Sequence, residues 1–517
     1  MAADAANVPR LSGWWPWNKQ NLRPVKEIHA GAGGPIGLAA RGGVSLIDRV
    51  AAPRTAVRQI HFTGACGRAV GSLALALKRR GWRVTASDKI QYAPMDRVLA
   101  EGGLAIAPKF AARNVPPGTE LVVVGGAIGR RNVERVAARR RGIPVMHMAR
   151  FVGEHLAGRH RRLVVAGTKG KTTTTAMLAW ILEHNGRRPD YLVGGLCPHF
   201  PLPVRYEGAP VMVLEGDEFP SSREDPTPKF LFYKPDVLVV TNVEFDHAEV
   251  YPSVREIQAL FVRLAGGLPA AGKLVVSGDC ANAAALARGC PAEAETVGWD
   301  SGSRFRLTGF KATPRGMRFR FCGQLFHLRQ PGRMLALDAA LAARAALHAG
   351  VGMAESAAAL AEFQGVAGRL EPLLDDPFAT IVHDESAHPS ALRENIAALR
   401  LRFPGRRLVV VLQPRYTGGR HNFHEQALPD VLAAADRVVL LRAFDPAPWP
   451  AGPFSSHRLA GQLRCRGLAA SVLNRSRSLA SYCARTHRAG DVWFCSLPAG
   501  CEFLTGPLVA AIRALAP

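Results

Sequence analysis

A lysine, a threonine, a glutamate and a histidine in this sequence are of the types that bind and activate a nucleotide polyphosphate. A lysine such as Lys171 can reach terminal phosphates, and a hydroxyl such as that of Thr172 can bind Mg²⁺. Glu215 and His247 each closely follow an apolar run typical of a buried strand, which favours a place at a strand's carboxyl end. We therefore expect Thr172, Glu215 and His247 to be metal ligands beside Lys171.

The lysine and the threonine belong to a phosphate-loop pattern. Leu163–Ala166 is apolar and predicts a buried strand, and Thr172–His184 predicts a helix. The turn between them would present backbone N–H groups to phosphate at the positive end of that helix. The spacing, Gly-Thr-x-Gly-Lys-Thr, is tighter than the usual Gly-x4-Gly-Lys-Thr loop. The residues expected to bind nucleotide here are Gly167, Thr168, Lys169, Gly170, Lys171, Thr172 and Thr173.

Two more apolar runs end in polar residues of the same kind. Val211–Leu214 runs into Glu215–Glu218, and Val237–Thr241 runs into Asn242–His247. Because the carboxyl ends of parallel strands meet at one edge of a sheet, these groups are expected to converge around a triphosphate. The sequence leaves open whether three further acids are ligands or solvated loop residues: Glu218, Glu244 and Glu249.

A second ligand site is indicated near the N-terminal end of the chain. Gln59–Thr63 predicts a strand, which leads through a glycine-rich turn into the helical Ser72–Arg80, and Val84–Asp88 predicts the next strand. This order is close to the dinucleotide fingerprint, in which glycines admit a pyrophosphate and a later acid contacts a ribose, although the glycine spacing differs. The residues expected to bind substrate here are Gly64, Gly67, Gly71 and Asp88.

The C-terminal part repeats the alternation of strands and helices after a packing helix at Leu335–Leu347. Its expected strands are Thr380–Asp384, Leu408–Gln413, Arg437–Leu441 and Val492–Cys495, and its expected helices include Ser390–Arg402 and His424–Ala435. Its strand ends carry Asp384, His388 and Arg415.

These patterns predict an α/β protein of three domains. A mobile extension at 1–57 would precede a Rossmann-like substrate-binding domain at 58–158. A central P-loop ATPase domain at 159–355 and a Rossmann-like C-terminal domain at 356–517 would follow.

Composition narrows the class of protein. The apolar share of 48% and the charged share of 21% are ordinary for a globular protein, and no apolar run is long enough to span a membrane. The nine cysteines are scattered without a Cys-x-x-Cys pair, which favours reduced thiols and a cytoplasmic location. The net charge of +25 is spread over the chain without any nucleic-acid-binding motif. Polyanionic small substrates explain that charge better than DNA or RNA.

Taken together, the motifs resemble those of the Mur ligases, ATP-dependent amide-forming enzymes of bacterial cell-wall synthesis. The resemblance covers residues 58 to about 515 and rests on six stretches: Gly64–Gly71, Gly167–Thr173, Glu215–Glu218, Asn242–His247, Phe363–Glu371 and Gln413–Thr417. It implies ATP and Mg²⁺ as cofactors, UDP-N-acetylmuramate as one substrate and an acyl-phosphate intermediate, with Lys171, Glu215 and His247 as catalytic residues. It also implies that Asn242, Arg369 and Asp384 bind ATP, and that His388 and Arg415 face substrate or phosphate.

Within the family, four stretches resemble the branch that joins a recycled cell-wall tripeptide to UDP-N-acetylmuramate: Tyr92–Met95, Met177–Leu182, Lys229–Tyr233 and Glu244–Glu249. The branch that adds L-alanine to the same acceptor is the alternative. Ligases that act later in the same pathway carry a carbamylated lysine beyond the Asp-His pair. Residues 248–272 contain no lysine, which disfavours that branch.

The sequence also departs from the family pattern. Lys169 stands where this branch usually has histidine, and Gly332–Asp338 replaces Gly-x-His-Asn-x-x-Asn. His383–Pro389 replaces Asp-Asp-Phe-Ala-His-His-Pro, and Phe219-Pro220 follows Glu218 where an acid is usual. These changes leave open a further interpretation, a non-catalytic relative that binds a UDP-sugar.

Overall fold

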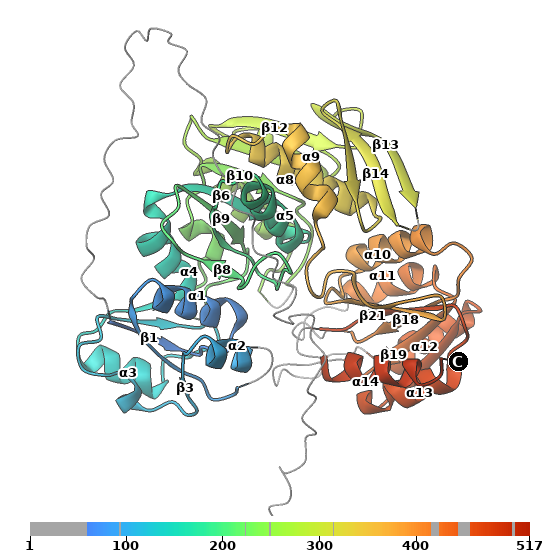
Figure 1. Ribbon diagram of the computed structural model, residues 1–517, viewed down its shortest axis with the longest axis horizontal. Coiled ribbons are helices and arrows are strands. Elements are labelled where there is room, and N and C mark those ends of the chain that lie inside the picture. The colour runs from blue at the N-terminus through green and yellow to red at the C-terminus, as the bar shows by residue number, and fades with distance from the viewer. Residues whose placement is uncertain are drawn as a thin grey trace, which may run out of the picture. The chain divides into compact units, whose positions relative to one another are not determined.

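The computed structural model describes residues 59–91, 95–222, 224–247, 250–313, 315–414, 423–442, 455–498 and 502–516. The N-terminal stretch 1–57, Tyr92, Glu249 and Arg415 therefore lie outside the described residues. The described chain forms three separate sheets, of five, ten and six strands, each with helices packed against it (Figure 1). No helix among these residues is both long enough and apolar enough to cross a membrane.

The first sheet is entirely parallel, in the order β3-β2-β1-β4-β5. Its central strand β1 carries Ile60 and Phe62, both buried, so this strand is covered by helices as parallel sheets require. The strands are β1 (Gln59–Thr63), β2 (Arg83–Ser87), β3 (Ile106–Ala107), β4 (Leu121–Val124) and β5 (Val145–His147). The helices are α1 (Arg68–Arg79), α2 (Met95–Glu101), α3 (Val133–Arg140) and α4 (Met148–Phe151).

The middle sheet runs in the order β15-β14-β13-β12-β11-β10-β6-β9-β7-β8. Its strands are β6 (Arg161–Ala166), β7 (Asp190–Leu192), β8 (Val204–Arg205), β9 (Val211–Gly216), β10 (Val237–Val240), β11 (Lys273–Ser277), β12 (Glu293–Gly298), β13 (Phe305–Thr313), β14 (Gly316–Phe321) and β15 (Gln324–Leu328). Its helices are α5 (Lys171–His184), α6 (Val254–Gly266), α7 (Ala281–Ala284), α8 (Arg333–Leu347) and α9 (Met353–Glu362).

The three strands predicted to carry the nucleotide site are neighbours in this sheet. β10, β6 and β9 are parallel, and their register places Ala166 beside Val240 on one side and Gly216 on the other. The groups that follow these strands therefore meet at one sheet edge, as the sequence predicted. In α5, the polar Thr172 and Thr174 are buried together with the apolar residues of the helix. Helix α5 packs on β6 and β9, beside α8, which packs on the neighbouring strands β10, β11 and β12.

The C-terminal sheet has the order β16-β17-β21-β18-β19-β20, parallel except for the edge strand β16. Two apolar cores fill its faces: α10, α11 and α12 cover one face, and α13 and α14 cover the other. The strands are β16 (Glu371–Asp375), β17 (Ala379–Asp384), β18 (Leu408–Leu412), β19 (Arg437–Leu441), β20 (Ala469–Leu473) and β21 (Asp491–Ser496). The helices are α10 (Pro389–Arg402), α11 (Phe423–Leu432), α12 (Ser456–Cys465), α13 (Leu479–Thr486) and α14 (Glu502–Arg513). The expected α/β class with Rossmann-like parallel sheets is thus confirmed.

Candidate active site

The phosphate loop between β6 and α5 depends on two glycines. Gly167 and Gly170 have φ angles of +142° and +80°, which side chains rarely adopt. A Cβ on Gly167 would overlap the hydroxyl of Thr241, and one on Gly170 would lie 2.7 Å from Oδ1 of Asp338. Space and backbone conformation together therefore require glycine at both positions.

The loop is held from the end of β10. The Asn242 side chain donates to the carbonyl of Lys169 (2.9 Å) and accepts from the N–H of the same residue (3.1 Å). The Thr241 hydroxyl donates to that carbonyl at 2.6 Å, and Thr168 N–H donates to the Asn242 carbonyl at 3.1 Å. Asn242, which was expected to bind ATP, thus has both ends of its amide on the loop backbone, where it fixes the loop's conformation.

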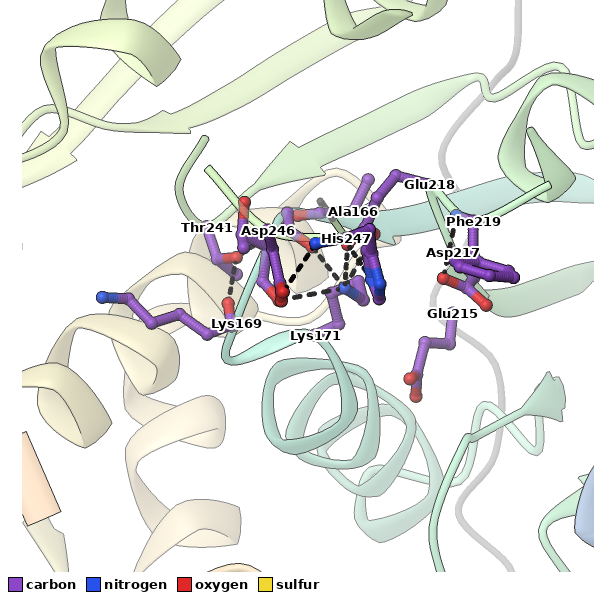
Figure 2. Close-up of polar contacts among 12 residues, drawn as sticks. Ala166, Lys169, Lys171, Glu215, Asp217, Glu218, Phe219, Thr241, Asp246 and His247 are labelled. Atoms are coloured by element: carbon purple, nitrogen blue, oxygen red, sulfur yellow. Dashed lines mark hydrogen bonds and ion pairs between the residues drawn. The ribbon is translucent and has the colours of Figure 1, made fainter. Parts of the chain in front are cut away.

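Lys171 lies at the start of α5 with its ammonium over the loop (Figure 2). It donates to the carbonyls of Gly167 (2.5 Å) and Thr168 (3.1 Å) and to both carboxylate oxygens of Glu218 (2.8 and 3.1 Å). Burial by itself would lower the pKa of Lys171, but the nearby carboxylates, above all Glu218, outweigh burial and raise the pKa above its ordinary value. The side chain is therefore a firmly charged cation placed where phosphate would bind.

Glu218 is not a solvated loop acid. Its side chain is only 1% exposed and is paired with Lys171. Of the other two acids left open by the sequence, Glu244 pairs with Lys169 at 2.6 Å, and Glu249 lies outside the described residues. The solvated interpretation is therefore wrong for Glu218, whereas the paired Glu244 side chain is 31% exposed.

Thr172 and Glu215 meet as the sequence predicted. The Thr172 hydroxyl donates to Oε1 of Glu215 at 2.9 Å, and Gly194 N–H donates to Oε2 at 2.7 Å. Burial raises the pKa of Glu215, against the opposing effect of the Gly194 N–H and of Lys171. A hydroxyl and a carboxylate are the hard oxygen ligands that Mg²⁺ takes together with water and substrate phosphates, so this pair fits that ion. Among the described residues no three or more His, Cys, Asp or Glu side chains gather as a metal cage.

His247 contacts Glu218, whereas Glu215 was the expected partner. Its Nε2 is 3.5 Å from Oε1 of Glu218, and its ring meets Phe219 edge to face at 4.9 Å between centroids (Figure 2). Its φ of +56° is left-handed, an uncommon conformation for a residue other than glycine. The structure thus brings His247 to Lys171 through Glu218, whereas Glu215 contacts Thr172.

Asp384 and Arg369, the C-terminal residues expected to bind ATP, contact other residues of the protein. Asp384 accepts N–H groups of Leu370 (3.0 Å) and Ser386 (2.8 Å), and burial raises its pKa. Arg369 donates to the carbonyl of Gly368 and, at 3.0 Å, to Glu385. These contacts order the turn that leads into β16, and contact with ATP stays a prediction.

His388 caps the start of α10. Its Nδ1 accepts from the N–H of Ser390 at 3.3 Å, and its Nε2 lies 3.1 Å from the carbonyl of Phe245. Because a carbonyl only accepts, Nε2 carries the proton in this arrangement. The Ser390 hydroxyl also donates to Glu244 at 2.6 Å, so α10 contacts the loop that follows β10. Arg415, the other residue expected to face substrate, lies outside the described residues.

The glycine-rich turn of the first sheet has its own anchoring acid. Gly64 has a φ of +82°, and Gly67 caps α1. A Cβ on Gly71 would overlap the carbonyl of Ala65, so glycine lets α1 pack closely against the turn. Oδ2 of Asp88 accepts the N–H of Cys66 at 2.7 Å, which fixes the turn. The start of α1 is thus shaped to receive an anion, and contact of Asp88 with a ribose stays a prediction.

Two site residues were missed by the sequence reasoning. Asp338 on α8 is buried against Gly170, and burial raises its pKa well above the ordinary value. Its signal was a lone acid within an alanine- and leucine-rich helix. Tyr251 donates its hydroxyl to the carbonyl of Glu218 at 2.6 Å, a contact that no sequence pattern indicates.

Comparison with known proteins assigns the family. A family model described as "Mur ligase family, catalytic domain" matches residues 59–160, and one described as "Mur ligase middle domain" matches residues 165–346. A structure of a murein peptide ligase from Psychrobacter arcticus 273-4 aligns with a TM-score of 0.66 at 24% identity, covering 89% of this chain and 100% of that one. That likeness shows a shared fold.

Two curated relatives extend the similarity to most of the chain. The UDP-N-acetylmuramate--L-alanyl-gamma-D-glutamyl-meso-2,6-diaminoheptandioate ligase of Haemophilus influenzae is 31% identical over 400 residues, 75% of this chain and 86% of that protein. The UDP-N-acetylmuramate--L-alanine ligase of Halorhodospira halophila is 33% identical over 432 residues, 81% of this chain and 86% of that protein. Sequence, fold and phosphate-loop geometry agree: the chain belongs to the Mur ligase family of ATP-dependent, amide-forming enzymes.

Proposed function

We propose that this ligase joins the carboxylate of UDP-N-acetylmuramate to the amino group of the tripeptide L-alanyl-γ-D-glutamyl-meso-diaminopimelate. The observation that supports ligase chemistry is the meeting of Lys171 and Thr172 with two carboxylates at one sheet edge: Lys171 with Glu218, and Thr172 with Glu215. The choice of substrates is supported by the relative from Haemophilus influenzae, which carries those substrates in its name.

The reaction requires activation, because a carboxylate lacks a usable leaving group. The muramic carboxylate attacks the γ-phosphorus of ATP, and ADP leaves. The substrate amine then attacks the acyl-phosphate carbonyl, loses a proton and expels phosphate, so that amide, ADP and phosphate are the products. The first step brings one anion onto another, and the Lys171 ammonium would screen that approach.

The metal site proposed for this reaction is formed by Thr172 and Glu215. Bound Mg²⁺ would supply positive charge to the phosphate oxygens. His247 as a further ligand stays a prediction, since its contact in the structure is with Glu218. For the UDP moiety we propose the turn formed by Gly64, Gly67 and Gly71 before α1. ATP and a UDP-linked sugar as substrates are consistent with a cytoplasmic enzyme.

Addition of L-alanine is the second candidate, supported by the relative from Halorhodospira halophila. The third, a non-catalytic UDP-sugar-binding protein, is motivated by the departures at Gly332–Asp338 and His383–Pro389. The presence of Lys171 on its carboxylate and of Thr172 on Glu215 speaks against it, since a pure binder has no use for this arrangement.

One assay separates these candidates. ADP release is measured with UDP-N-acetylmuramate, ATP and Mg²⁺, adding either the tripeptide or L-alanine, with each acceptor omitted in turn. The proposal expects release only in the complete mixture, with kcat/KM for the tripeptide at least about 100-fold above that for L-alanine. Preference for L-alanine would support the second candidate. Binding of the UDP-sugar without ADP release would support the third.

A further inference from the structure

The hydrogen-bonding capacity of the Lys171 ammonium is fully used by the protein itself. An ammonium has three N–H groups and no acceptor. Two of its partners are the carbonyls of Gly167 and Thr168, and the third is the Glu218 carboxylate, which it meets with both oxygens. A phosphate oxygen can therefore bond to Lys171 only by taking over one of these positions.

Glu218 is the partner that a phosphate most resembles. The two carbonyls belong to the loop backbone, and Thr168 is itself tied to Asn242 and Glu244, so moving them would distort the loop. The carboxylate is a separate anion on the chain that follows β9. Of the three partners, only the Glu218 carboxylate carries a negative charge, so it is the partner that a phosphate oxygen would replace.

The surroundings of Glu218 fix its position. Its side chain is 1% exposed, Tyr251 holds its carbonyl at 2.6 Å, and His247 lies 3.5 Å from its carboxylate. With its main chain held by Tyr251 and its side chain buried, this carboxylate would remain beside the loop when its cation is drawn away. There it would repel a bound phosphate.

We propose that Glu218 is a positioning residue that holds the Lys171 ammonium over the loop and competes with a nucleotide phosphate for it. The proposal rests on nucleotide binding at this loop, as proposed above. It predicts that binding energy is partly used to separate Lys171 from Glu218, so that Glu218 lowers nucleotide affinity while it keeps the lysine in place for turnover.

The test is the Glu218→Gln enzyme, which keeps the shape of the side chain and removes its charge. Mg-ADP affinity is measured by calorimetry, and KM for ATP and kcat by ADP release. We expect ADP to bind about ten-fold more tightly, and KM for ATP and kcat to fall together. A purely structural role would instead weaken ADP binding and raise KM.

The matched control is Asp217→Asn. Asp217 is the neighbouring acid, and it pairs with Lys229 at 2.6 Å rather than with Lys171. This variant removes the same charge one residue away, and its ADP affinity should change by less than about three-fold, as expected for a more distant charge.

Should Glu218→Gln fail to fold, Glu218→Asp carries the same expectation at smaller size, because it withdraws the carboxylate from Lys171 by one methylene. Equal or weaker ADP binding by a folded Glu218 variant would overturn the inference while leaving the proposed function in place. A wild-type enzyme that binds no ADP would instead overturn the proposed function.

Discussion

At the scale of single residues, Lys171 combines burial with charge. Its side chain is 13% exposed, yet carboxylates raise its pKa, so it stays cationic under all ordinary assay conditions. A cation that is already charged and in place before the chemical step lowers the barrier for phosphoryl transfer.

Removing this cation should therefore be costly for turnover. We expect Lys171→Ala to lower kcat by at least about 10³-fold, or roughly 4 kcal/mol of transition-state stabilisation. Lys229→Ala is the matched control, since Lys229 pairs with Asp217 near the same strand end without touching the loop. Near-normal ADP release by the Lys171 variant would reject its assigned role.

The loop glycine in contact with Asp338 offers a second test. Gly170→Ala should weaken Mg-ADP binding by at least about ten-fold, because a left-handed φ and a clash 2.7 Å from Asp338 both distort the loop. Gly186→Ala is the control: its φ is +71°, but no atom lies within 4 Å of the added Cβ. If the two variants bind ADP equally well, loop geometry at Gly170 is not important.

At the scale of elements, the order β10-β6-β9 does most of the positioning. The sequence predicted this much because each strand is an apolar run followed by polar residues, a pattern set by local physics. It did not predict the antiparallel β13–β15 extension or the antiparallel edge strand β16, whose pairing depends on partners distant in the chain.

The contacts at the site divide in the same way: local patterns predict some of them, and the rest depend on how distant parts of the chain meet. Thr172 and Glu215 follow from strand ends and from the loop pattern. Which of two acids three positions apart faces Lys171 depends on the turn taken after β9, and the sequence does not encode that turn in a readable pattern. For this reason Glu218 was left open, and His247 was expected beside Glu215 rather than beside Glu218.

The contact between β12 and α8 gives a stability prediction. Glu295 of β12 is 2% exposed and bonds Arg344 at 2.6 and 2.8 Å and His348 at 3.2 Å. Burial would raise the pKa of Glu295, but the bonds from His348 and Arg344 outweigh it and lower the pKa from 4.5 to about 2. The ionised carboxylate therefore stabilises the fold above pH 4.5, and this stabilisation is lost as the pH falls toward 2.

Accordingly, Glu295→Gln should lose about 2–3 kcal/mol of unfolding free energy at pH 7. The difference from wild type should shrink between pH 4.5 and pH 2, as followed by thermal unfolding in circular dichroism. Glu293→Gln serves as the control, because Glu293 lies on the same strand as Glu295. Its side chain pairs with Lys273 and Arg304 but is 47% exposed. A difference that is constant with pH would contradict the assignment.

At the scale of the whole molecule, the net charge of +25 matters for substrate encounter. ATP and a UDP-sugar are both polyanions, so a positive protein raises their local concentration, and salt screens that effect. We expect kcat/KM for both proposed nucleotide substrates to fall about three- to ten-fold between 0.05 and 0.3 M NaCl, with kcat nearly constant. A flat salt profile would show that the charge serves another purpose.

The way Asn242 and Thr241 hold the loop bears on how this family can diversify. Both bind the main chain of Lys169, and neither binds its side chain. Mutation at this position therefore leaves the loop's shape intact, so a lineage can exchange the side chain without first losing its nucleotide site. In this chain the side chain at that position, Lys169, pairs with the carboxylate of Glu244.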